Sequence, residues 1–203
     1  MAKKIQRIEN IQLGTASSLT RYGDKEDSLL ITLPETAKVS CQFTNNKLKA
    51  APVKLAIEHL SHSSNGEKAF LINAGNANAA TGSQGMRDVK FYCKEMASDL
   101  NLKKENIIPF STGVIGEAFP LDNYLNAFRE AKSKLSVKNW SKAANAILTT
   151  DTKPKIISKQ VKIEKEIYSI TGFAKGSGMI RPDFATLLCL LYTSDAADDW
   201  SSV

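Results

Sequence analysis

Hydrophobic positions along the chain repeat with two different periods. A period of three to four residues is typical of amphipathic helices, and a period of two, or a short apolar run, is typical of strands. The first pattern predicts helices over residues 53–62, 83–100, 121–135 and 140–148. The second predicts strands over residues 29–33, 39–43, 69–73, 107–111, 156–163 and 167–173. Because helices and strands are mixed along the chain, we expect an α/β or α+β sandwich, and periodicity does not choose between the two.

Composition bounds the class of protein. The chain has 203 residues, of which 42% are hydrophobic and 24% charged, an ordinary balance for one globular domain and perhaps a second small one. The formal net charge is +6, but the lysines are scattered along the chain. Scattered lysines do not indicate nucleic-acid binding. They indicate a basic surface, which can attract an anionic small substrate.

The cysteine and histidine pattern does not predict a metal site. Cys41, Cys93 and Cys189 are far apart, no CxxC pair is present, and the chain has only two histidines. Free thiols suit a reducing compartment. The N-terminal residues lack the apolar core of a signal peptide, and no apolar run approaches the length of a membrane helix. We therefore expect a cytoplasmic protein that binds neither a membrane nor nucleic acid.

Polar segments at the ends of predicted strands and helices are the candidate sites. A strand that ends in Thr112–Gly113 can direct a hydroxyl and a backbone N–H at one point, as an oxyanion requires. The threonines and the aspartate of residues 149–152 can bind a polar substrate, and Lys175, before a glycine turn, can hold a carboxylate. Taken singly, each segment is also compatible with a plain turn, a helix cap or a surface lysine. The asparagine-rich segment 73–82 can line a polar pocket or form a tight loop.

Five segments together resemble the ornithine acetyltransferases, also called glutamate N-acetyltransferases. The resemblance covers roughly residues 29–188, with the motifs in the family's order. The motifs are Phe-Thr-Asn-Asn with Lys-Ala-Ala-Pro-Val, Asn-Ala-Gly-Asn-Ala-Asn-Ala, Ser-Thr-Gly-Val-Ile-Gly, Thr-Thr-Asp-Thr, and Ala-Lys-Gly-Ser-Gly-Met-Ile-x-Pro-x-x-Ala-Thr. Asp183 and Phe184 depart from the asparagine and methionine that are usual in the family, beside the proposed nucleophile.

The resemblance implies a self-cleaving acyltransferase. The precursor would be cut between Ala185 and Thr186, and the new α-amine of Thr186 would act as base for its own hydroxyl, the nucleophile. An α-amine, with a pKa of roughly 8, suits that task. Thr112 and Gly113 would form the oxyanion hole.

The same resemblance implies the substrates. Thr149, with Thr152 as the alternative, and Lys175 would bind them together with Thr186. The acetyl group would move from N-acetyl-L-ornithine to L-glutamate in ping-pong steps of arginine biosynthesis, without a metal or a bound cofactor. Some members of the family also accept acetyl-CoA as the acetyl donor.

The family fold is a layered sandwich of mixed β-sheets covered by helices, the self-cleaving DmpA/ArgJ-like fold, which we expect to be incomplete in this chain. Residues 1–185 would form the α-chain, and residues 186–188 would begin the β-chain. The two chains would stay together, commonly as an α2β2 heterotetramer. Two other functions remain open: an aminopeptidase of the related self-cleaving fold, and an inactive binding fragment.

The last residues carry a different signal. The segment from Cys189 to Asp199 back-translates to a transposase adapter used to prepare sequencing libraries. We therefore expect residues 189–203 to be a non-native tail. Residues 193–196 also loosely resemble a family segment that follows the cleavage site, which is the alternative origin.

Overall fold

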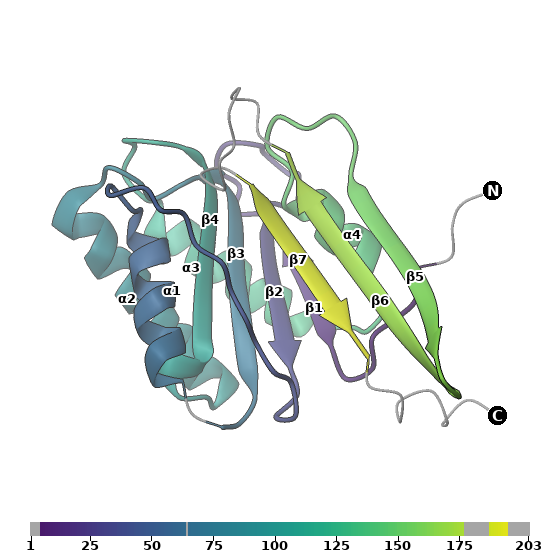
Figure 1. Ribbon diagram of the computed structural model, residues 1–203. Helices are drawn as coiled ribbons and strands as arrows, with labels where there is room; N and C mark the ends of the chain where they lie inside the picture. The colour runs from purple at the N-terminus through teal and green to yellow at the C-terminus, as the bar shows by residue number, and fades with distance from the viewer. Residues whose placement is uncertain (1–4, 64, 177–186, 195–203) are drawn as a thin grey trace.

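The computed structural model describes residues 5–63, 65–176 and 187–194. These residues form two sheets and several helices (Figure 1). The strands are β1 (Gln12–Ala16), β2 (Ser28–Leu33), β3 (Lys68–Asn76), β4 (Ile107–Val114), β5 (Lys155–Ile163), β6 (Glu166–Lys175) and β7 (Leu188–Thr193). The helices are α1 (Ala51–His62), α2 (Gly82–Leu100), α3 (Leu121–Ser133), α4 (Trp140–Ala146) and a 3-10 turn, η1 (Lys104–Asn106).

The first sheet has the order β1-β2-β3-β4. Its first three strands are antiparallel, whereas β4 runs parallel to β3, because α2 carries the chain back to the same end of the sheet. Helices α2 and α3 cover one face of this sheet, and α1 packs along the β4 edge (Figure 1). The core on this face joins Leu30 and Leu71 of the strands to Tyr92 and Phe128 of the helices.

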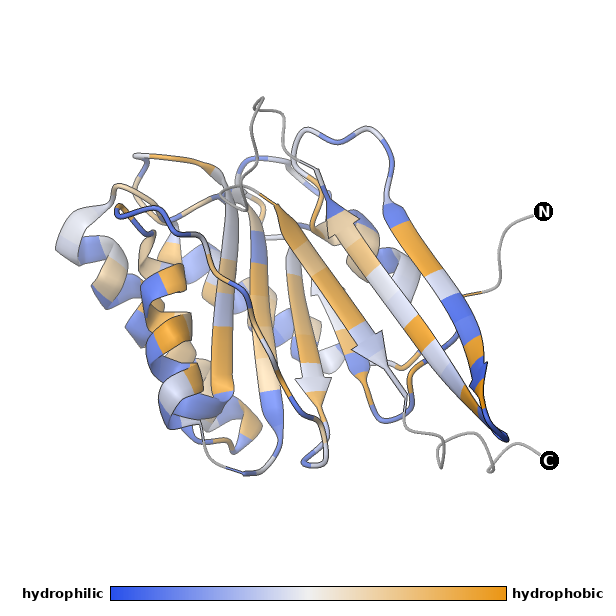
Figure 2. Cartoon of the chain, in the orientation of Figure 1, coloured by the Kyte–Doolittle hydropathy of each residue, from blue (hydrophilic) through white to orange (hydrophobic). Residues whose placement is uncertain are grey.

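The second sheet has the order β5-β6-β7, all antiparallel. It shares a core with the opposite face of the first sheet, where Leu29, Ile31 and Ile72 point away from α2 and α3, because successive strand residues face opposite sides. Trp140 of α4 lies between the sheets, with its ring 5.2 Å from that of Tyr192 and 6.3 Å from that of Phe173. Hydrophobic residues accordingly predominate in β3, β4 and β7, and hydrophilic residues lie on the outer surfaces of the helices (Figure 2).

The mixed α+β fold confirms the predicted class, and all four predicted helices are present. One predicted strand is wrong: residues 39–43 form no strand. Their apolar side chains, Val39 and Phe43, do pack against the core, but in the described part of the chain no strand pairs with this segment. Strands β1 and β7 were not predicted. No helix among the described residues is long and apolar enough to cross a membrane.

Candidate active site

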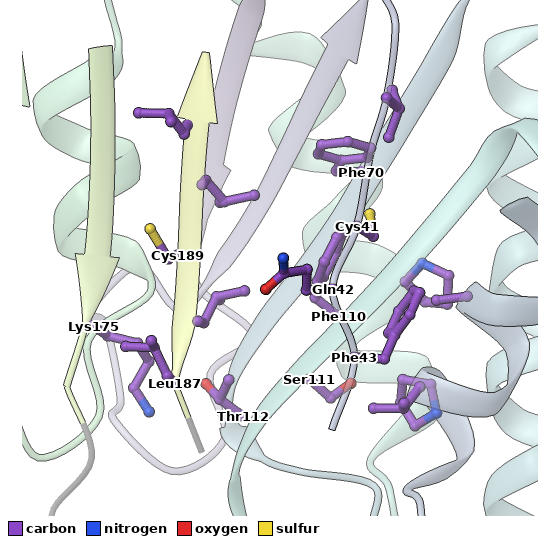
Figure 3. Close-up of a pocket in the computed structure, with 18 of the residues that line it drawn as sticks. Cys41, Gln42, Phe43, Phe70, Phe110, Ser111, Thr112, Lys175, Leu187 and Cys189 are labelled. Carbon is purple, nitrogen blue, oxygen red and sulfur yellow. The ribbon is translucent and has the colours of Figure 1, made fainter. Parts of the chain in front are cut away.

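A cavity of about 1340 Å³ lies between the two sheets, at the ends of β4, β6 and β7 (Figure 3). Four of the five motifs singled out from the sequence contribute to its polar end, through Ala77, Thr112, Thr149 and Lys175. The remaining motif supplies Phe43, which lies with Phe70 and Phe110 at an apolar part of the wall. The rings of Phe70 and Phe110 pack edge to face, 5.3 Å apart. The structure therefore brings together segments that are distant in the sequence.

The Thr-Gly pair lies near the end of β4, beside β3. In the parallel ladder Thr112 lies opposite Ala74, and Gly113 lies opposite Gly75. Gly113 has a φ of +133°, and a Cβ there would lie 2.3 Å from the carbonyl carbon of Gly75. Only glycine fits that backbone conformation and that space. The backbone of Gly113 consequently borders the cavity without a side chain to cover it.

The side chain of Asn73, in β3, stabilises the strands that carry Thr112 and Gly113. Its side chain is fully buried, accepts a hydrogen bond of 2.5 Å from the Ser111 hydroxyl and donates one of 2.7 Å to the Asn76 carbonyl. The Thr112 hydroxyl, by contrast, reaches the Asn73 carbonyl only at 3.5 Å, too long for a strong hydrogen bond. The Thr112 hydroxyl is therefore free to bind another group in the cavity.

The loop after β1 supplies two cavity residues that sequence reasoning missed, Arg21 and Tyr22. Asp27, which is buried, anchors the loop by accepting hydrogen bonds from the backbone N–H and the hydroxyl of Ser18. Burial raises the pKa of Asp27, and the bonds from Ser18 oppose that rise. The Nη2 atom of Arg21 donates hydrogen bonds to both carboxylate oxygens of Glu117, beyond β4. No local sequence pattern marks these residues, because the site brings them together only in the folded chain.

Lys175 is the last residue of β6, lies opposite Leu188 of β7 and is only 5% exposed. Burial lowers the pKa of Lys175, and the nearby carboxylate of Asp151 partly opposes that effect. In the described part of the chain, no hydrogen bond or ion pair ties its ammonium group to another residue. A buried cation without a partner, at the wall of a cavity, is suited to bind an anionic ligand.

The threonine segment between α4 and β5 lies beside Lys175. Thr149 and Thr150 line the cavity, whereas Thr152, the other residue that the sequence offered, is exposed outside it. The Lys25 ammonium donates a hydrogen bond of 2.9 Å to the Leu148 carbonyl and so ties the start of this segment to the loop after β1. Thr149 accordingly lines the same cavity as Thr112 and Lys175.

Ala185 and Thr186, the predicted cleavage site and nucleophile, lie outside the described residues. Leu187, which is bonded to Thr186 in the sequence, is described and lines the cavity. Figure 3 shows the Leu187 side chain between those of Lys175 and Thr112. The predicted oxyanion and substrate-binding residues thus line the same cavity as the residue that follows the predicted nucleophile.

Comparison with known proteins identifies the family. The model of the ArgJ family matches residues 12–200 of the chain. An "Arginine biosynthesis bifunctional protein ArgJ" of Colwellia psychrerythraea is 43% identical over 190 residues, which is 89% of this chain and 45% of that protein. A protein of the same name from Methylococcus capsulatus is 40% identical over 186 residues, 92% of this chain and 45% of that protein. The chain thus spans less than half the length of these curated relatives.

Two solved structures share the fold. The arginine biosynthesis bifunctional protein ArgJ of Bacillus halodurans superposes with a TM-score of 0.76 at 29% identity, covering 89% of this chain and 92% of the solved one. Ornithine acetyltransferase of Mycobacterium tuberculosis, solved in complex with ornithine, superposes with a TM-score of 0.72 at 25% identity, covering 89% of this chain and 94% of the solved one. From the motifs, the fold and the matched length together, the chain belongs to the ArgJ family.

Proposed function

We propose that the protein to which this chain belongs transfers an acetyl group from N-acetyl-L-ornithine to L-glutamate in arginine biosynthesis. The observation that carries the proposal is the convergence of Thr112, Gly113, Thr149 and Lys175 on one cavity, beside Leu187. Relatives named for arginine biosynthesis and a solved relative that binds ornithine support this choice of substrates. Because the relatives are named bifunctional, the proposal includes acetyl-CoA as a second acetyl donor to glutamate.

In the proposed reaction the Thr186 hydroxyl attacks the acetyl carbonyl and its proton passes to the α-amine of the same residue. Negative charge develops on the carbonyl oxygen, where the Thr112 hydroxyl and the Gly113 N–H stabilise it. Ornithine leaves with a proton on its amine, and the acetyl group stays on Thr186. The amine of glutamate then attacks that ester and regenerates the free threonine. No step needs a metal or a bound cofactor.

Substrate binding follows from charge. N-acetylornithine and glutamate share an α-carboxylate, and the buried Lys175 ammonium provides the opposite charge at the cavity wall. The Thr149 hydroxyl lines the same part of the cavity and can complete the hydrogen bonds. The acetyl donor and the acetyl acceptor can therefore use one site in turn, as ping-pong transfer requires.

Cleavage between Ala185 and Thr186 belongs to the same proposal. The chain covers more than 90% of each solved relative but only 45% of the curated full-length ones, so the solved chains are themselves about half-length. This agrees with a precursor cut into two chains that reassemble, and we propose an α2β2 heterotetramer. A cytoplasmic location rests on the free cysteines and stays a prediction.

The test uses the full-length protein, expressed as wild type and as Thr186→Ala. We expect wild type to show two masses separated at the bond before Thr186 and to transfer acetyl from acetylornithine to glutamate. Thr186→Ala should remain one uncut and inactive chain. An active wild type without the cut would refute the nucleophile, and hydrolysis of peptides without acetyl exchange would favour the aminopeptidase.

A further inference from the structure

Asp151 is a buried acid that the proposed reaction does not use. It lies in the segment between α4 and β5, directly behind the cavity residues Thr149 and Thr150, and its side chain is only 7% exposed. A carboxylate removed from water is costly unless its oxygens are paired. Its Oδ1 atom is paired, whereas its Oδ2 atom is buried and has no hydrogen-bond partner among the residues that the structure describes. A buried group of this kind needs an explanation.

The paired oxygen holds the start of the segment that carries the cleavage site. Asp151 Oδ1 accepts a hydrogen bond of 3.0 Å from the backbone N–H of Gly176, the residue that follows β6. A Cβ on Gly176 would lie 3.0 Å from the same oxygen, so a glycine there lets the carboxylate approach closely. Asp151 thereby fixes the backbone one residue after Lys175.

The charge of Asp151 acts on Lys175. Burial raises the pKa of Asp151, but hydrogen bonds from Lys155 and Gly176 and the charges of Lys155 and Lys175 lower it below its usual value, so the group is a carboxylate. Lys155 also binds Oδ1, but from the surface, with 55% of its side chain exposed. Lys175 is buried, and the negative charge of Asp151 favours its protonated form. The negative charge of Asp151 therefore favours the charged form of Lys175, although no ion pair joins the two in the described part of the chain.

We infer that Asp151 is a positioning residue of the substrate site, which holds the backbone of Gly176 and so fixes the end of β6 that carries Lys175. This inference rests on the proposed function, because it assigns Asp151 a part in binding the carboxylate of the substrate through Lys175. Asp151 does not line the cavity and does not contact the substrate. Its loss changes the affinity for substrate more than the rate of the chemical step.

The test compares Asp151→Asn, Asp151→Ala and Lys155→Met in the full-length protein, with KM and kcat measured for acetylornithine and for glutamate. Asparagine keeps an acceptor for the Gly176 N–H but loses the charge. Asp151 acts on the substrate only through Lys175, and a tenfold change in affinity corresponds to about 1.4 kcal/mol. We therefore expect Asp151→Asn to raise both KM values about tenfold, with kcat changed much less.

Asp151→Ala also loses the hydrogen bond to Gly176. We therefore expect the same rise in KM together with slower cleavage before Thr186, which intact-mass measurement detects. Lys155→Met leaves Asp151 in place and should keep both KM values within about twofold of wild type. This variant tests the inference even where an Asp151 variant does not fold. A tenfold rise in KM for Lys155→Met would show that the surface ion pair between Lys155 and Asp151 is what matters, and would overturn the inference.

Two further results would also overturn it: wild-type KM values for Asp151→Asn, or a lower kcat at unchanged KM. Failure of the proposed function is a separate outcome, because wild type itself would then transfer no acetyl group.

Discussion

At the scale of single residues, Gly113 combines a positive φ with a close backbone neighbour. Its φ of +133° is strained for any other residue, and a Cβ would collide with the backbone of Gly75 in the neighbouring strand. We expect Gly113→Ala to destabilise the full-length protein by at least about 2 kcal/mol, as overpacking and backbone strain typically do. Thermal unfolding measures the effect.

Gly116→Ala is the matched control, since Gly116 also has a positive φ, of +84°, but no atom within 4 Å of the added Cβ. It should cost less than Gly113→Ala, because it adds strain without a collision. Equal losses for the two variants would show that the close approach of β3 and β4 is not what restricts Gly113.

The Thr112 hydroxyl has a weak partner in the chain, so its removal should affect the reaction more than the fold. We expect Thr112→Ala to lower kcat by roughly 10²–10³, the usual effect of losing one oxyanion donor. The Gly113 N–H would still donate, so some activity should survive. Thr112→Ser keeps a hydroxyl and should restore most of the rate. Normal turnover of Thr112→Ala would remove Thr112 from the oxyanion hole.

Lys175 links stability to function. Burial lowers its pKa in the folded state, which means that the unfolded chain holds this proton more tightly. Lys175→Met should therefore raise the free energy of unfolding by roughly 1 kcal/mol while abolishing substrate binding, a common exchange at active sites. Thermal unfolding and substrate titration together test this.

The pH dependence of Lys175 has a definite sign. Between the lowered folded pKa and the ordinary lysine pKa of about 10.4, the unfolded state binds more protons, so folding stability rises with pH in that window. The advantage of Lys175→Met over wild type should accordingly be largest near neutral pH and shrink as pH rises through the lowered pKa. An advantage that grows with pH would contradict the cost assigned to the buried charge.

At the scale of elements, sequence periodicity located the helices and strands that pack through one continuous face. The helix predicted over residues 83–100 is observed as Gly82–Leu100, and the strand predicted over residues 29–33 as Ser28–Leu33. Periodicity did not predict the segments whose conformation depends on the element that they pack or pair with. Residues 39–43 have the alternation of a strand but border the cavity instead, and β1 exists because it pairs with β2.

The candidate site shows the same division. Motif resemblance selected Thr112, Gly113, Thr149 and Lys175, and the structure gathers them at one cavity. Motif resemblance could not select Arg21 and Tyr22, or the contact of Asp151 with Gly176, because these depend on loops that meet only after folding. The roles of the gathered residues stay predictions, as does the origin of residues 189–203.

Strand β7 offers a test of its own packing. The Tyr192 ring is buried against Trp140 and Phe173, but its hydroxyl is buried without a hydrogen-bond partner in the described structure. Removing an unpaired buried hydroxyl while keeping the ring should be neutral or stabilising, so we expect Tyr192→Phe to gain up to about 1 kcal/mol. Tyr192→Ala should lose about 3–5 kcal/mol through the cavity it leaves. Thermal unfolding of this 203-residue chain separates the two. If neither variant shifts the midpoint, β7 does not pack against α4 as described.

At the scale of the whole molecule, the second sheet presents an apolar surface. Leu191 of β7 and Ile157 of β5 are 67% and 61% exposed, and β7 is an edge strand of its sheet. Adjacent exposed apolar side chains and an open strand edge favour association with another protein surface. The curated relatives have more than half of their length beyond the matched part, enough chain to cover this sheet.

We therefore expect the 203-residue chain by itself to self-associate and to transfer no acetyl group. The proposed reaction needs an ordered Thr186 with a free α-amine, and a site of that kind must be supported on all sides. Size-exclusion chromatography and an assay with acetylornithine and glutamate test the chain alone and co-expressed with the remainder of the full-length protein. Co-expression should yield a defined heteromer with activity. A monomeric chain that transfers acetyl alone, at the rate of the full-length enzyme, would show that the described cavity is already complete and that the apolar surface of the second sheet has another purpose.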